Sequence, residues 1–80
     1  MQIPVIKKLA ETFTLDQLKA AEEAMMNEQQ PAIEIEGKDE GEQLTHVLAA
    51  IDMLTDMQTN NVDLRTALRN YSQRVRNSIS

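Results

Sequence analysis

The sequence predicts a mainly α-helical protein of four short helices and one brief extended or β segment around residues 33–36, assembled as a homodimer. Apolar residues recur every three or four positions along most of the chain, which is the period of an amphipathic helix. The chain has 80 residues and no cysteine, so its single domain, residues 1–80, buries a small core that disulfides cannot supplement. A partner chain is the expected supplement.

The first helix is expected over residues 4–11, because Pro4 suits the first helical position and begins a stripe of helical period. The stripe consists of Val5, Ile6, Leu9, Ala10 and Phe13. The β-branched residues at positions 3, 5 and 6 leave a strand over residues 3–6 as the alternative.

The second helix has the clearest start. Thr14 and Gln17 match a capping box, in which each side chain accepts a hydrogen bond from the backbone N–H of the other residue. Phe13 before the cap and Leu18 at the fourth helical position match the hydrophobic staple that accompanies such a start. The helix is expected to end between residues 27 and 30, before Pro31.

An extended segment follows the second helix. Ile33 and Ile35 alternate with Glu34 and Glu36, which is the period of a half-buried strand. A lone strand leaves its backbone groups without hydrogen bonds. Three alternatives follow: pairing with the N-terminal segment, pairing with the same segment of another chain, or no regular strand.

Two longer helices complete the chain. The third is expected over residues 40–59, with Asp39 as its cap and Glu42 as the second half of a capping box. The fourth is expected over residues 62–77, with Asn61 or Asp63 as its cap. Gly37 and Gly41 are expected to provide unusual backbone angles at the turn before the third helix.

The third helix is apolar on two sides. One broad face carries Leu44, Val47, Leu48, Ile51, Leu54 and Thr55, and the opposite side carries His46, Ala50, Met53 and Met57. A helix that is apolar on most sides is usually buried, and four short helices can hardly surround this one. We therefore predict that the stripe from His46 to Met57 packs against a twofold-related copy. The alternative is that the first two helices cover it within one chain.

The fourth helix has one narrow apolar stripe, formed by Leu64, Leu68, Tyr71, Val75 and Ile79. Arg65, Arg69 and Arg76 lie along one flank of this stripe and Arg74 lies along the other. Cations beside an apolar seam are typical of helix packing. We predict that the first three arginines belong to the interface. Asp52, Asp56 and the acids of the second helix are candidate ion-pair partners for the arginines on both flanks.

Charge and composition exclude several classes of protein. Residues 1–59 hold twelve acids against four lysines, a net charge of −8, whereas residues 60–80 have a net charge of +3. The acidic bulk disfavours general nucleic-acid binding, although the arginines of the last helix leave a weak nucleic-acid binder as an alternative. No apolar run approaches the ~20 residues of a membrane span. The N-terminus lacks the order of a signal peptide, so we predict a cytoplasmic protein.

Glu42 and His46 are the candidate metal ligands, because they lie four residues apart on one helical face. The alternative is that Glu42 stabilises the helix start and His46 is a packed residue with local hydrogen bonds. The chain contains no nucleophile–base set and no phosphate-binding glycine loop. We therefore predict no enzymatic activity, no catalytic residue and no cofactor.

Two segments, EGKDEGEQLTHVLAAI at residues 36–51 and IPVIKKL at residues 3–9, resemble a small uncharacterised family of proteins from Bacteroidetes-type bacteria. The resemblance extends over the whole chain and implies a domain of unknown function, with no activity or ligand to transfer. The sequence predicts a non-enzymatic interaction or accessory module that acts as a homo-oligomer and leaves an acidic surface for another protein. The alternative function is binding of a metal or small ligand through Glu42 and His46.

Overall fold

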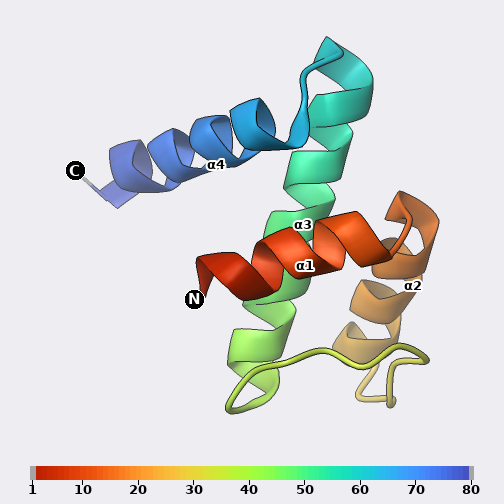
Figure 1. The fold of residues 1–80 in the computed structure, drawn as a ribbon. Coiled ribbons are helices and arrows are strands. Elements are labelled where there is room, and N and C mark those ends of the chain that lie inside the picture. Colours follow the sequence, from red (N-terminus) through yellow and green to blue (C-terminus); the bar gives the residue numbers. More distant parts are fainter. Residues whose placement is uncertain (1, 80) are drawn as a thin grey trace.

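The computed structural model describes the backbone of residues 2–79 and the side chains of residues 2–77. Its four helices are α1 (Ile3–Thr12), α2 (Leu15–Met26), α3 (Glu40–Asn60) and α4 (Leu64–Ile79). The long helix α3 packs against each of the other three. Figure 1 shows α2 running beside α3 in the opposite direction, α1 crossing in front of α3, and α4 leaving the upper end of α3 on the side away from α2. The predicted helices are confirmed, including the helical reading of residues 3–6.

The helix starts follow the predicted capping residues. The Gln17 N–H donates to Thr14 Oγ1 at 3.2 Å, and the Thr14 N–H donates to Gln17 Oε1 at 2.9 Å, which confirms the capping box of α2. Asp39 Oδ1 accepts the Glu42 N–H at 2.8 Å at the start of α3. In a capping box the Glu42 carboxylate would accept the N–H of the cap residue Asp39, but here it accepts the N–H of the preceding residue, Lys38.

The fourth helix starts two residues later than expected. Asp63, the second of the two residues proposed as its cap, accepts the Thr66 N–H at 2.8 Å, so α4 begins at Leu64. Asn61 instead ends α3 in the left-handed conformation, with φ 54°. The side chain of Ile79, the last member of the predicted apolar stripe, lies outside the described residues.

Of the three alternatives for residues 33–36, no regular strand is the observed one, because residues 2–79 contain no strand, so the β part of that prediction is wrong. The alternation of burial is nevertheless present: Ile35 is 7% exposed and Ile33 packs against the core, while Glu34 and Glu36 are exposed. Within residues 2–79, this segment forms no β-ladder with another. Side chains of α3 bind the backbone instead, since His46 contacts the Glu36 carbonyl and Gln43 donates to the Gly37 carbonyl.

The unusual backbone angle expected at Gly37 and Gly41 is present only at Gly37. Gly37 has φ 158°, and a Cβ on it would lie 2.8 Å from Gln43 Cγ and 3.0 Å from the Gln43 nitrogen. Its lack of a side chain therefore lets the loop approach α3. Gly41 lies within the first turn of α3 and has no unusual φ, so the expectation for it is wrong.

The core lies between α1, α2 and the side of α3 that the sequence assigned to a partner. Its fully buried members with the largest side chains are Ile6, Leu18, Met53, His46 and Val47. The broad leucine face is divided: Val47 is fully buried and Ile51 and Leu54 pack against the core, whereas the outer side at Leu48 is 46% exposed. The Cα radius of gyration is 12.2 Å, close to the value of about 12 Å expected for a compact domain of this length.

Within the described residues, no helix combines the length and the apolar character needed to cross a bilayer.

Candidate interaction surface

His46 joins three parts of the chain inside the core. It is 0% exposed, and its Nδ1 lies 2.8 Å from the carbonyl oxygen of Glu36. A carbonyl can only accept, so Nδ1 carries the hydrogen and donates it. Nε2 then accepts the N–H of Gln2, the N-cap residue of α1, at 3.0 Å. The imidazole therefore holds the start of α1 and the loop before α3 onto α3.

This arrangement does not bring a metal site together. Both ring nitrogens of His46 bond backbone groups, which leaves no lone pair directed at an ion. Glu42 accepts the N–H of Lys38 at the start of α3, the structural role that was its alternative. Residues 2–79 contain no group of three or more His, Cys, Asp or Glu side chains placed to hold a metal.

The stripe predicted to face a second copy faces the core of its own chain. His46, Ala50 and Met53 are each 0% exposed, and Met57 is half-buried against the same core. The alternative reading, in which α1 and α2 cover this stripe, is the observed one. Helical period did not reveal this, because the methionine stripe and the broad leucine face are both apolar and each has a fully buried member, Met53 and Val47.

Helix α4 meets α3 through Ala67 and polar side chains, while Leu64, Leu68 and Tyr71 of its apolar stripe pack partly buried against the core. Ala67 is fully buried at this contact, and Asn70 and Arg74 on the same side of α4 bind carboxylates of α3. Leu64 and Leu68 lie on a neighbouring side and are only half-buried. The predicted row of Arg65, Arg69 and Arg76 is exposed along the next side round the helix.

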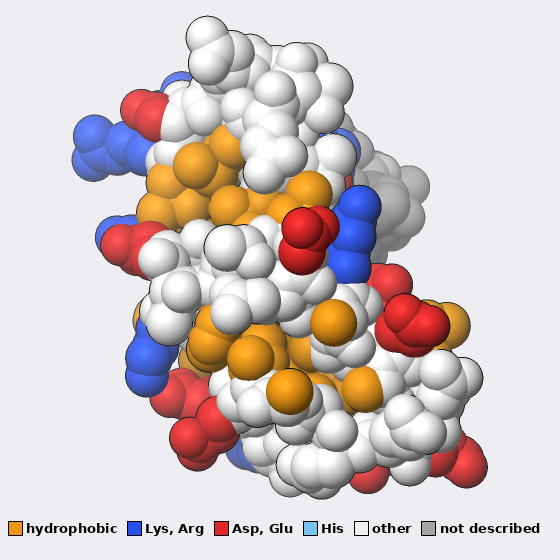
Figure 2. All heavy atoms as spheres, turned by 90° about the vertical axis from the view of Figure 1, so that its right-hand side faces the viewer, with side chains coloured by type: hydrophobic (Ala, Val, Ile, Leu, Met, Phe, Trp, Pro, Cys, Tyr) orange, Lys and Arg blue, Asp and Glu red, His pale blue; other side chains and the backbone are white. Residues whose placement is uncertain are grey.

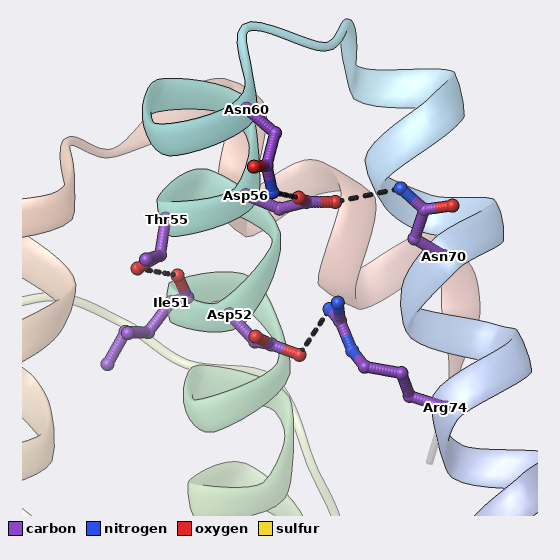
Figure 3. Close-up of polar contacts among 7 residues, drawn as sticks. All are labelled: Ile51, Asp52, Thr55, Asp56, Asn60, Asn70 and Arg74. Carbon is purple, nitrogen blue, oxygen red and sulfur yellow. Dashed lines mark hydrogen bonds and ion pairs between the residues drawn. The ribbon is translucent and has the colours of Figure 1, made fainter.

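The carboxylates of α3 that bind α4 are shown in Figure 3. Asp56 is 5% exposed and accepts hydrogen bonds from Asn60 and, at 3.0 Å, from Asn70 of α4. The Asn70 hydrogen bond, followed by that of Asn60, lowers the pKa of Asp56 below its usual value of 3.8. Asp52 forms an ion pair with Arg74 at 2.7 Å, which confirms one predicted pairing, while Asp56 uses amides instead of an arginine.

The outer side of α3 forms an apolar surface together with the end of α2. Met26 is 69% exposed, Leu48 is 46% exposed, and Ile51 lies one helical turn after Leu48. Ile51 and Met26 line one shallow hollow with Lys19, Glu22 and Glu23. We call Met26, Leu48 and Ile51 the α2–α3 patch. Figure 2, seen from the side of α2, shows apolar side chains reaching the surface between charged ones.

A second surface lies between α1 and α4. Lys7 of α1 and Asp63, Leu64, Arg65 and Leu68 at the start of α4 line an open groove of about 400 Å³. We call it the α1–α4 groove. Its walls are leucine side chains, and two of its three charged groups are cations. This groove includes Arg65 of the predicted interface.

A smaller hollow of about 180 Å³ lies between α1 and the segment around residues 34–36. Lys8 and Glu36, which line it, form an ion pair at 3.1 Å. Thr12, Glu34 and the apolar side chains of Val5, Leu9 and Phe13 complete its lining.

Sequence reasoning missed the α2–α3 patch. One clue was present: Met26 lies outside the inward stripe of the second helix, which carries Leu15, Leu18, Ala21 and Met25. A methionine left out of a stripe at the end of an amphipathic helix is either exposed or covered by another element. The sequence alone does not distinguish these two cases.

Comparison with curated proteins and with solved structures finds no significant match. The model of one protein family, described as a family of unknown function (DUF6952), matches residues 1–80. This match confirms the family-level resemblance of the sequence. Because the match extends over the whole chain, the protein belongs to this family of unknown function.

Proposed function

We propose that the protein is a non-enzymatic interaction module that acts as a homo-oligomer in the cytoplasm, with the α2–α3 patch as its contact surface. The exposure of Met26 and Leu48 beside Ile51 is the observation that supports this proposal. Single exposed apolar residues are normal, but a cluster of long apolar side chains rimmed by charges is typical of a contact surface. The patch replaces the buried stripe of α3 as the proposed interface.

The small core also favours a partner. Eighty residues without disulfides bury a modest core, so covering further apolar surface in an assembly would stabilise the fold. Burial of the Met26 and Leu48 side chains would contribute about 3 kcal/mol, roughly a hundredfold in the dissociation constant.

Sedimentation velocity over a range of concentrations tests the proposal with the double variant Met26→Lys/Leu48→Lys. The wild type is expected to associate as its concentration rises, and the variant is expected to remain monomeric. Thr12→Lys, an exposed position on α1, is the matched control and should associate like the wild type. A wild type that is monomeric at every concentration would refute the proposed function.

A further inference from the structure

We propose that copies of the chain associate head to tail, with the α1–α4 groove and the arginine row of one copy lying on the α2–α3 patch of the next. The inference rests on the proposed function and specifies which surfaces meet. The proposed function names only the α2–α3 patch, whereas this inference also names the surface that the patch contacts.

The two surfaces have opposite charge around apolar centres. The α2–α3 patch is bordered by Glu22 and Glu23 of α2, with Lys19 as the one cation of that hollow. The α1–α4 groove is bordered by Lys7 and Arg65, and the arginine row continues along α4 with Arg69 and Arg76. Complementary borders of this kind guide two surfaces together and exclude like-charged pairings.

The same charges argue against contact between two identical patches. A twofold contact through the α2–α3 patch would bring Glu22 and Glu23 of both copies to one interface. Residues 1–59, which include this patch, have a net charge of −8, whereas residues 60–80, which include α4, have a net charge of +3. A contact between the basic helix of one copy and the acidic body of another reduces this repulsion.

The positions of the two surfaces also favour a head-to-tail contact. Helix α4 leaves α3 on the side opposite to α2, so the groove and the patch lie on different sides of one molecule (Figure 1). A contact between two different surfaces is heterologous, and it forms a ring or grows into a longer assembly. Each copy can therefore bind one neighbour through each surface.

Two variants that each lose one surface provide the test. Arg65→Glu/Arg69→Glu alters the groove side, and Met26→Lys/Leu48→Lys alters the patch; all four positions are exposed, so circular dichroism should show folded proteins. Each variant alone should associate at least about 100-fold more weakly than the wild type, because like charges then face each other. Lys38→Glu, an exposed reversal in the loop before α3, is the control and should associate normally.

The decisive measurement is the equimolar mixture of the two variants. The intact patch of the groove variant then meets the intact groove of the patch variant, so a one-to-one dimer should appear in sedimentation. Two variants that stay monomeric when mixed, beside a wild type that associates, would overturn the head-to-tail contact and leave the proposed function standing. A groove variant that associates like the wild type would also overturn it, since the patch would then pair with itself. A monomeric wild type would remove both proposals.

Discussion

At the scale of single residues, His46 shows how one polar side chain can fix the meeting of three segments. His46 is the only histidine of the sequence and lies on an apolar stripe, so the two hypotheses for it were a metal ligand and a packed residue. The structure uses both of its nitrogens for the backbone of Gln2 and Glu36. The sequence could name the residue but not its partners, which lie 44 and 10 positions away.

Replacing His46 with alanine should therefore destabilise the fold. The change leaves the Gln2 N–H and the Glu36 carbonyl, whose hydrogen bonds are part-buried, without their partner and creates a cavity, which together cost about 2–4 kcal/mol. Urea denaturation measures the free energy of unfolding, and hydrogen exchange should show faster exchange of the Gln2 amide. A cost no larger than that of an exposed substitution would contradict this role.

Asp56 should make the stability of the protein depend on pH in acid. Its pKa is lowered in the folded state by Asn70 and Asn60, so the unfolded chain takes up this proton first as the pH falls. The stabilising contribution is therefore complete well above pH 3.8 and is lost as the pH falls below that value.

Asp56→Asn tests this dependence by urea denaturation at neutral pH and in acid. The variant should be less stable than the wild type at neutral pH, and the difference should shrink in acid. Asp63, whose pKa is also lowered, through its hydrogen bonds with Thr66, remains in both proteins and contributes equally to both curves. A difference that is the same at both pH values would contradict the argument.

At the scale of the elements, the sequence located the helices well because capping and periodicity act over a few residues. Thr14 with Gln17, Asp39 and Asp63 each occur where a helix starts, and each accepts the N–H expected of a cap. The sequence predicted the end of α2 less closely than its start. Its last carbonyls bond to Glu28 and Gln29 in a Schellman motif, and Glu28 has φ 59°, a conformation that glycine adopts without strain.

Glu28→Gly should therefore stabilise the protein by about 1 kcal/mol, because it removes the left-handed strain of a residue with a Cβ. Thermal denaturation followed by circular dichroism measures the change. Glu23→Gly, which makes the same substitution at an exposed position inside α2, is the control and should destabilise by about 1 kcal/mol. Destabilisation by both changes would show that the φ of Glu28 carries no strain.

At the scale of the whole molecule, the two sides of α3 should respond differently to truncation. Met53→Ala opens a cavity in the core and should cost about 2–5 kcal/mol. Leu48→Ala on the α2–α3 patch should cost less than about 1 kcal/mol when measured below the concentration at which the protein associates. Chemical denaturation of both variants checks the assignment of inner and outer sides, and equal costs would contradict it.

The sequence by itself determined that this protein is helical, where its second and third helices begin, and that Ile35 turns inward while Glu34 and Glu36 turn outward. These features depend on contacts between residues a few positions apart, which periodicity and capping report directly. Only the tertiary structure decided which side of α3 is buried. Both sides are apolar, so helical period alone could not choose between the Met53 side and the Leu48 side. Long-range packing of α1 and α2 on α3, together with the hydrogen bonds of His46, buries the Met53 side. The candidate interface is therefore the α2–α3 patch and not the methionine stripe.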